Sequence, residues 1–332
     1  MPELRDKFSV IMPVLNAKAH LRASLDSIMA AMRRYGNGEL IVLDNGSNDG
    51  SYEILLNEYG SRATLRQVRD MTVAGLRNCG ARLADGEFLA FIDSDCEIVP
   101  DYFEQALKVL RTCADVTGAK CAVDDSPHWI EKTWYEMHVQ RQDGTVSYIN
   151  SGNLVLKRQA FLRVNGFDER MIGCEDADLC DRLIHAGFKM FQAHAVRAIH
   201  HGGDKTLGVF FRKHAWRSLG MFGMLKNTWM SKPLLMTFAQ LFLCIAAIAN
   251  LFVPRTPIFL RLVYFLLLVD LAPVITILYR AWQVKRAPYA PAKAILLYHV
   301  YFFARFYAIW KLVLFSRASL ENRCAIGARL RG

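Results

Sequence analysis

Paired cysteines and a glycine-rich dinucleotide motif are both missing from this chain of 332 residues. Its eight cysteines form no C-x-x-C pair and no zinc-ligand spacing, which excludes a zinc fold and indicates reduced thiols in the cytosol. The first apolar run is followed by VLNAKAH instead of G-x-G-x-x-G, which excludes a dinucleotide-binding oxidoreductase. The charged N-terminus, MPELRDKFSV, argues against a cleaved secretory signal.

Acidic residues are scarce in the C-terminal part of the chain. Residues 1–203 carry 23 Lys and Arg against 28 Asp and Glu, whereas residues 204–332 carry 18 against 3. The basic excess lies among long apolar runs, and no nucleic-acid-binding motif accompanies it. We therefore expect membrane lipids, and not nucleic acid, to be the partner of this part.

The first part of the sequence alternates between strand and helix patterns. Apolar runs at 8–13, 39–44, 64–69 and 87–93 predict strands, and amphipathic runs at 19–35, 49–59, 73–84 and 101–113 predict helices. This alternation predicts an α/β fold with a parallel sheet covered on both faces. Ligands bind such sheets beyond the C-terminal ends of the strands, where the sequence places Asn16, Asp44, Asp93 and Asp95.

The last third of the chain has the composition of a membrane region. We predict a catalytic domain at 1–203, an amphipathic interfacial segment at 204–232, and a membrane region at 233–332. Two runs, 234–253 and 262–279, are expected to span the bilayer as a hairpin with cytoplasmic ends, leaving the catalytic domain on the cytoplasmic face. The run 294–315 is interrupted by charges and either lies in the interface or spans, ahead of a basic tail. The alternative is that all three runs form a buried soluble core.

Two carboxylates, Asp93 and Asp95, end the apolar run EFLAFI. Burying carboxylates there is costly unless a cation binds them, and Mg²⁺ or Mn²⁺ with a diphosphate would suit a D-x-D pair. The alternative is an acidic turn before the next helix. Asp44 could accept hydrogen bonds from a base or ribose, or serve only the following turn. Arg77 could neutralise a diphosphate, or be an ordinary solvated helix residue.

Five blocks resemble, in order, the family 2 glycosyltransferases of the glycosyltransferase A (GT-A) fold: SVIMPVLN, VLDNGSNDGS, LRNCGARLADGEFLAFIDSD, SGNLVLKRQAFLRVNGFDE and GCEDADLCDRL. The resemblance covers about residues 7–203 and implies a role for each matching position. The nucleotide side would be formed by Pro13 and Asn16 near the base, Asp44 at the base, Arg77 at the nucleotide or diphosphate, and Asp93 at the ribose. Asp95 would bind the metal, and Gly152 and Asn153 would line the donor-sugar and acceptor site.

The same resemblance implies the chemistry of the acidic pair at 175–176. Asp176 would be the base that receives the acceptor proton, and Glu175 would shape the acceptor side. One base and in-line attack imply inversion at the anomeric carbon. The alternative is that both are helix-terminal charges favoured by the dipole. His200, in IHHGG, matches a position that reaches the metal or diphosphate, and its neighbour His201 is the other candidate for that position. The alternative is a structural histidine.

These observations predict a membrane-associated, Mn²⁺- or Mg²⁺-dependent, inverting glycosyltransferase. Its donor would be a nucleotide-diphosphate-sugar, and its acceptor a lipid-linked sugar or glycan of a cell-surface polysaccharide or glycolipid. The alternatives are a polyprenyl-phosphate glycosyltransferase and a non-catalytic, nucleotide-sugar-binding scaffold of a synthase complex. A processive synthase is disfavoured, because the Q-x-x-R-W motif of those enzymes is absent and Trp216 precedes Arg217 instead.

Overall fold

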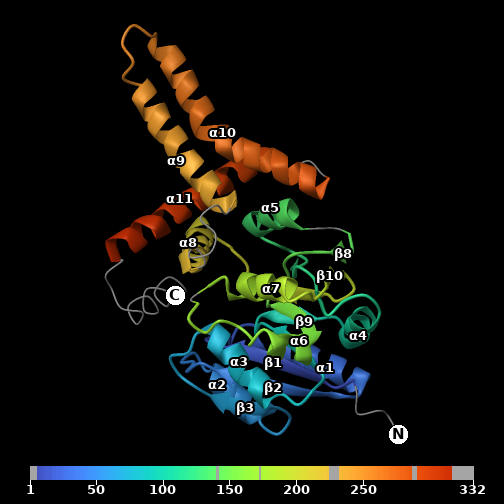
Figure 1. Cartoon of the computed structure of the whole chain (residues 1–332). Helices are drawn as coiled ribbons and strands as arrows, with labels where there is room; N and C mark the ends of the chain where they lie inside the picture. The colour runs from blue at the N-terminus through green and yellow to red at the C-terminus, as the bar shows by residue number, and fades with distance from the viewer. Residues whose placement is uncertain (1–5, 140–141, 172, 224–231, 286–289, 316–332) are drawn as a thin grey trace. The chain divides into compact units, whose positions relative to one another are not determined.

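Figure 1 shows the computed structural model, which describes residues 6–139, 142–171, 173–223, 232–285 and 290–315. The chain divides into two compact units. The first contains Met1–Ser126 and Gln140–Gly203, and the second contains Pro127–Val139 and Asp204–Gly332. The second unit thus takes in a short segment from within the range 1–203. The predicted basic tail after residue 316 and the end of the predicted interfacial segment lie outside the described residues.

An eight-stranded sheet forms the centre of the first unit, as an α/β fold requires. Strands β1 to β4 are mutually parallel, and β9 runs antiparallel between β4 and β6. The predicted α/β class is confirmed, but the sheet is mixed beyond its parallel half. In sheet order the strands are β3 (Thr64–Gln67), β2 (Gly38–Asp44), β1 (Phe8–Val14), β4 (Phe88–Ile92), β9 (Asn153–Lys157), β6 (Val116–Gly118), β10 (Met190–Gln192) and β8 (Gly144–Thr145).

Helices cover both faces of this sheet, and successive residues of β1 point to opposite cores. Val10 and Met12 pack in the core that includes α1 and α4, whereas Ile11 packs in the core that includes α3, α6 and α7. Helix α3 approaches β1 closely at Gly80, because glycine has no Cβ. A Cβ there would lie 2.4 Å from Ile11 Cγ2. The helices are α1 (Leu21–Tyr35), α2 (Ser51–Ile54) with a π-helical turn η1 (Leu55–Tyr59), α3 (Val73–Leu83), α4 (Tyr102–Thr112), α6 (Arg158–Arg163) and α7 (Glu175–His185).

A second, small sheet pairs the segment that follows β4 with the last strand of the first unit. Its strands are β5 (Cys96–Ile98), β11 (Ala198–His200) and β7 (Ala122–Val123), with β11 in the middle. In this register His200 pairs with Cys96, the residue after Asp95. The backbone N–H of His201 also donates to the carbonyl of Asp95 at 2.9 Å. The sheet therefore brings IHHGG beside the D-x-D segment.

The second unit is helical and is packed around aromatic side chains. The ring of Trp134, on α5, contacts that of Phe210 on α8 and those of Tyr298 and Tyr301 on α11. The predicted apolar runs 234–253, 262–279 and 294–315 fall on its last three helices. The helices are α5 (Trp129–His138), α8 (Leu207–Gly223), α9 (Lys232–Asn250), α10 (Ile258–Val284) and α11 (Pro291–Phe315).

Among the described helices, α10 alone is long and apolar enough to cross a membrane by length and composition. Its most apolar window has a mean hydropathy of 2.3 and is 11% buried. Large side chains on it, such as Phe259 and Leu267, are exposed. The neighbouring apolar helix, Leu235–Asn250, is shorter.

Candidate active site

The D-x-D segment turns sharply at the end of β4. Asp93 accepts the backbone N–H of Cys96 on its carbonyl at 3.1 Å, and its own N–H donates to the carbonyl of Gly152 at 3.4 Å. A Cβ on Gly152 would lie 2.7 Å from Asp93 Oδ2, so a side chain there would displace the carboxylate. The structure thus places Gly152 against Asp93, at the edge of the sheet where parallel strands present ligand sites.

Asp95 and His200 form a candidate metal-binding pair. Asp95 Oδ2 lies 3.2 Å from His200 Nε2, and the side chains are 29% and 34% exposed. A Cβ on Gly202 would lie 2.0 Å from the same carboxylate oxygen, so glycine leaves room for it. An oxygen and an imidazole nitrogen suit Mn²⁺, which often takes its other ligands from phosphate and water. The described residues contain no group of three or more His, Cys, Asp or Glu arranged to hold a metal.

Arg77 joins the D-x-D segment to the start of α7. Its Nη2 donates to Asp93 Oδ1 at 2.8 Å, and its Nη1 donates to Glu175 Oε1 at 2.7 Å. Burial disfavours the guanidinium charge, but Asp93 and Glu175 outweigh burial and raise the pKa of Arg77. Burial raises the pKa of Glu175, with Arg77 acting in the opposite direction. The family resemblance implies that Arg77 faces the nucleotide or diphosphate; in the structure both ends of its guanidinium meet carboxylates.

Asp176 is held by residues that the sequence analysis did not identify. Its Oδ2 accepts hydrogen bonds from Tyr148 Oη at 2.7 Å and Asn150 Nδ2 at 3.0 Å. Asn150 Oδ1 in turn accepts the backbone N–H of Gly152 at 2.8 Å. The sequence pattern that could have identified them is YIN, an apolar residue between two polar ones. In the structure Ile149 is buried, whereas Tyr148 and Asn150 are exposed.

Asp44 ends β2 with a buried carboxylate. Oδ2 accepts the backbone N–H groups of Gly46 and Ser47 at 3.0 and 3.1 Å, and Gln67 Nε2 at 3.0 Å. Within the described part of the chain, Oδ1 is buried and has no hydrogen-bond partner. A buried carboxylate oxygen without a donor is costly, which suits an oxygen that a ligand N–H or O–H would satisfy.

Pro13 and Asn16 lie at the C-terminal end of β1, beside this carboxylate. Pro13 pairs with Leu43 in the parallel register, one residue before Asp44. Asn16 is exposed and adopts a positive φ of 52°. Its Oδ1 accepts the N–H of Asn48 at 2.9 Å, which ties the loop after β1 to the loop after β2. The structure therefore brings both residues to the same sheet edge as Asp44.

Asn153 is placed otherwise than the sequence predicts. Its side chain is fully buried, and it does not present a free amide to a ligand. Oδ1 accepts Tyr102 Oη at 2.6 Å, and Nδ2 donates to the carbonyls of Ala119 and Val196 at 3.0 and 2.9 Å. Asn153 thus joins the carbonyls of Ala119 and Val196 to the hydroxyl of Tyr102. It lies on the same face of β9 as Val155, which packs in the core that includes α1 and α4.

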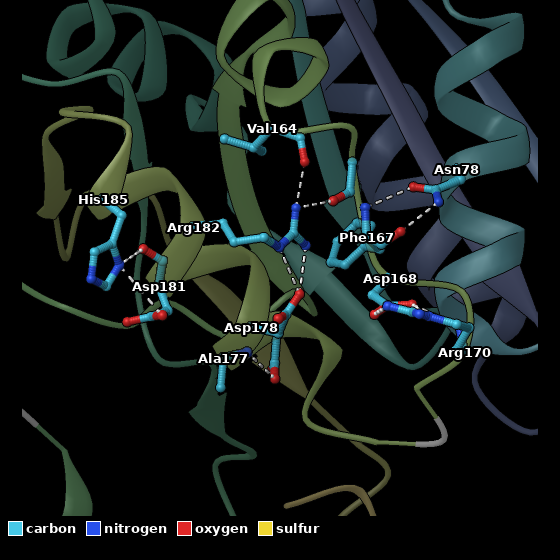
Figure 2. Close-up of polar contacts among 12 residues, drawn as sticks. Asn78, Val164, Phe167, Asp168, Arg170, Ala177, Asp178, Asp181, Arg182 and His185 are labelled. Atoms are coloured by element: carbon cyan, nitrogen blue, oxygen red, sulfur yellow. Dashed lines mark hydrogen bonds and ion pairs between the residues drawn. The ribbon is translucent and has the colours of Figure 1, made fainter. Parts of the chain in front are cut away.

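Helix α7 is bound to the turn that follows α6, as Figure 2 shows. Arg182 donates to Asp178 Oδ2 at 2.6 and 2.8 Å and to the carbonyls of Val164 and Gly166 at 2.5 and 2.7 Å. Asn78, next to Arg77 on α3, exchanges two hydrogen bonds with the backbone of Phe167. These contacts fix α7 and α3 to the same turn, so the acidic pair and Arg77 keep their separation.

Comparisons with known proteins show similarity to glycosyltransferases. Residues 9–164 match the model of glycosyl transferase family 2. The match, together with relatives named as glycosyltransferases, supports a glycosyltransferase. Residues 137–202 also match a second family, described as the N-terminal domain of galactosyltransferase. The two matched segments together contain every predicted site residue.

Two curated relatives illustrate the similarity. The chain is 28% identical over 199 residues to the amylovoran biosynthesis glycosyltransferase AmsB of Erwinia amylovora, covering 55% of this chain and 65% of that one. It is 36% identical over 114 residues to the glycosyltransferase GlyA of Streptococcus pneumoniae, covering 33% and 16%. The aligned part therefore spans less than two thirds of either relative.

A solved structure supports the fold. The mannosyltransferase PcManGT from Pyrobaculum calidifontis, solved with GDP-Man and Mn²⁺, aligns with 99% of this chain and 88% of its own at a TM-score of 0.54 and 17% identity. The first unit therefore has the GT-A type of fold, as the sequence predicts.

Proposed function

We propose that this protein is a metal-dependent, inverting glycosyltransferase of family 2 that acts at a membrane surface. One observation carries the proposal. Arg77 connects Asp93, on the donor side, to Glu175, next to the candidate base Asp176. A single buried cation thus fixes the separation between the group that would hold the donor and the group that would activate the acceptor.

The donor would be a nucleotide-diphosphate-sugar. Asp44 Oδ1 would accept a hydrogen bond from the base or ribose, with Pro13 and Asn16 beside it and Asp93 towards the ribose. Asp95 and His200 would hold Mn²⁺ or Mg²⁺, consistent with the Mn²⁺ and GDP-Man bound by the structural relative. A bound divalent cation would neutralise the charge that develops on the leaving diphosphate.

The transfer step follows from the carboxylates. The acceptor oxygen forms a bond to the anomeric carbon as its proton passes to Asp176. The bond from that carbon to the diphosphate oxygen breaks, and the nucleoside diphosphate leaves with the electron pair. A single displacement inverts the anomeric configuration. Glu175 is bound to Arg77, so its role would be to orient the start of α7 and not to take the proton.

The acceptor is proposed to be lipid-linked or a glycan, in the synthesis of a cell-surface polysaccharide or glycolipid. The amylovoran relative is named for polysaccharide synthesis, which supports this class. Exposed apolar side chains on α10 and the basic composition after residue 204 support contact with membrane lipids. We propose that the catalytic unit lies on the cytoplasmic face, where nucleotide-sugars are made.

Donor turnover tests the proposal. The detergent-purified protein would be incubated with UDP-, GDP- and dTDP-sugars, Mn²⁺ or Mg²⁺, and a membrane lipid extract. We expect one donor to release its nucleoside diphosphate, and EDTA, Asp95→Asn and Asp176→Asn each to reduce release at least 100-fold. Asp181→Asn is the matched control, because Asp181 lies on the same helix with a 65% exposed side chain.

The same assay separates the alternatives. Release that survives Asp176→Asn and requires polyprenyl phosphate would favour transfer to an acceptor that is already ionised. Nucleotide-sugar binding without release under any acceptor would favour a scaffold. Release that is indifferent to EDTA and to Asp95→Asn would contradict the metal site.

A further inference from the structure

The carboxylate of Asp176 has one lone pair left that can accept a hydrogen bond. It receives three hydrogen bonds, from the N–H of Ala177 to Oδ1 at 2.8 Å, and from Tyr148 and Asn150 to Oδ2 at 2.7 and 3.0 Å. A carboxylate offers about four lone-pair sites, two on each oxygen. Oδ2 is therefore filled, and the remaining position is on Oδ1. Tyr148 and Asn150 decide which oxygen can take a proton.

The ring of Tyr148 lies at the surface beside this carboxylate. The residue is 46% exposed, whereas Asp176 is 8% exposed. A tyrosine whose hydroxyl is bound inward presents its apolar ring to solvent. Sugar rings have an apolar face of C–H groups and a rim of hydroxyls, so they pack on such a ring while a hydroxyl reaches a neighbouring acceptor.

The charge around this position favours a neutral acceptor. Asp176 and Glu175 are adjacent carboxylates, and Arg77, the cation that binds Glu175, is already engaged by Asp93 as well. A phosphate acceptor would bring further negative charge to this pair, whereas a sugar hydroxyl would not. The site thus suits a hydroxyl that must lose its proton.

We propose that Tyr148 and Asn150 are the acceptor-side positioning residues, and that the acceptor is a saccharide hydroxyl packed on the Tyr148 ring and not a bare lipid phosphate. This inference rests on the proposed function. The Tyr148 hydroxyl and the Asn150 amide hold Oδ2, so the acceptor proton passes to Oδ1. The ring positions the sugar that carries the attacking oxygen.

Two substitutions at one position separate the two roles. Tyr148→Phe keeps the ring and removes the hydroxyl, so kcat should fall about tenfold with the KM for acceptor unchanged, as expected for one hydrogen bond to a charged group. Tyr148→Ala removes both, so kcat should fall and the acceptor KM should rise at least fivefold. Asn150→Ala should behave like Tyr148→Phe. The KM for donor should not change in any variant.

The assay would use the full chain in detergent, with octyl glucoside, octyl galactoside and octyl N-acetylglucosaminide as hydroxyl acceptors and a polyprenyl phosphate as the ionised one. Tyr52→Phe is the control, a tyrosine on α2 outside the site. Transfer to polyprenyl phosphate alone would overturn the acceptor assignment. A Tyr148→Phe enzyme with undiminished kcat would overturn the positioning role. The Tyr148 hydroxyl would then only occupy the position of the acceptor hydroxyl in the empty site, without any part in the reaction.

A binding measurement keeps this inference separate from the proposed function. Saturation-transfer NMR would detect the octyl glycosides with Mg²⁺ and nucleoside diphosphate present, without any turnover. Wild type and Tyr148→Phe should bind at least one glycoside, and Tyr148→Ala should not. Absence of glycoside binding by wild type, or equal binding by Tyr148→Ala, would overturn the role of the ring even if the enzyme transfers sugar. If the binding results are as expected but wild type transfers no sugar, the proposed function is contradicted instead.

Discussion

The guanidinium of Arg77 donates to Glu175 Oε1 at 2.7 Å, and both side chains are almost completely buried. The other end of the guanidinium reaches Asp93 at 2.8 Å. Burying charges is costly unless they are paired with good geometry, so this arrangement stabilises the native state only while all three groups are present. The donor-side and acceptor-side carboxylates therefore depend on one cation.

We predict that Arg77→Met destabilises the first unit by about 3–5 kcal/mol, because it leaves the buried carboxylate of Glu175 without its partner. Urea unfolding followed by circular dichroism would measure the change. The double variant Arg77→Met with Glu175→Gln should recover part of the loss. Arg82→Met is the control on the same helix, since its side chain is 62% exposed and its ion pair with Glu169 spans 3.4 Å. If Arg77→Met and Arg82→Met destabilised the protein equally, the dependence of the buried carboxylate of Glu175 on Arg77 would be contradicted.

A second prediction concerns the room that Gly202 leaves for Asp95. Gly202→Ala would place a Cβ 2.0 Å from Asp95 Oδ2, so the carboxylate must leave its present position beside His200. We expect the affinity of Mn²⁺ for the nucleotide-loaded protein to fall at least tenfold, with little change in thermal stability. Titration calorimetry of Mn²⁺ in the presence of nucleoside diphosphate would measure it.

Gly144→Ala is the matched control for this substitution. A Cβ on Gly144 would meet nothing within 4 Å, so its metal affinity should equal that of wild type. Unchanged Mn²⁺ affinity in Gly202→Ala would show that Asp95 and His200 do not hold the metal.

The elements that the sequence predicts well are those fixed by local periodicity. The four parallel strands follow from short strand patterns between helical ones. The carboxylates that end β2 and β4 come together because strand ends in a parallel sheet meet at one edge. The antiparallel insertion of β9 could not be predicted in the same way. Its direction depends on pairing with β4 and β6, which lie far away in the sequence.

The site was predicted unevenly for a similar reason. Motifs indicate which residues gather, but they do not indicate which way each side chain points. Asn153 is turned into the core by the alternation of β9, and the exposed residues Tyr148 and Asn150 reach Asp176 from the preceding segment. The partners of Arg77 come from 16 and 98 residues away, beyond any local pattern.

Asp44 provides a third prediction, about the nucleotide. The three N–H donors on Oδ2 would fix the oxygen of Asn in Asp44→Asn at that position. The amide would then present N–H groups at the Oδ1 position, where the ligand is expected to donate. Losing a hydrogen bond to a charged group costs about 1.5–3 kcal/mol, so nucleoside diphosphate should bind about 10- to 100-fold more weakly. Fluorescence titration with a labelled nucleotide would measure this.

The control for Asp44→Asn is Asp26→Asn, the same chemical change at a carboxylate bonded to Tyr59 Oη. It should leave nucleotide affinity unchanged. If both variants bind nucleotide as wild type does, the unpartnered oxygen of Asp44 has no role in binding.

The last prediction concerns the pH dependence of the second unit, through His214 on α8. Burial, with the nearby charge of Arg217 second, lowers the pKa of His214 well below its usual value of 6.5. Below pH 6.5 the unfolded chain binds a proton at this position that the folded chain does not, so stability should fall as the pH is lowered. The loss from this one group is at most about 1.4 kcal/mol per pH unit, or about 2 kcal/mol at pH 5.

His214→Phe should remove this dependence, because the variant keeps an aromatic ring against Trp134 and Phe210 but cannot bind a proton. All six tryptophans of the chain belong to the second unit, so thermal unfolding followed by tryptophan fluorescence reports on that unit. We expect the wild-type midpoint to fall between pH 7.5 and 5.0 more steeply than that of His214→Phe, while His185→Gln, at an exposed histidine, follows wild type. Parallel pH curves for wild type and His214→Phe would mean that folded His214 takes up the proton as readily as the unfolded chain, and that its burial does not set the stability of these helices.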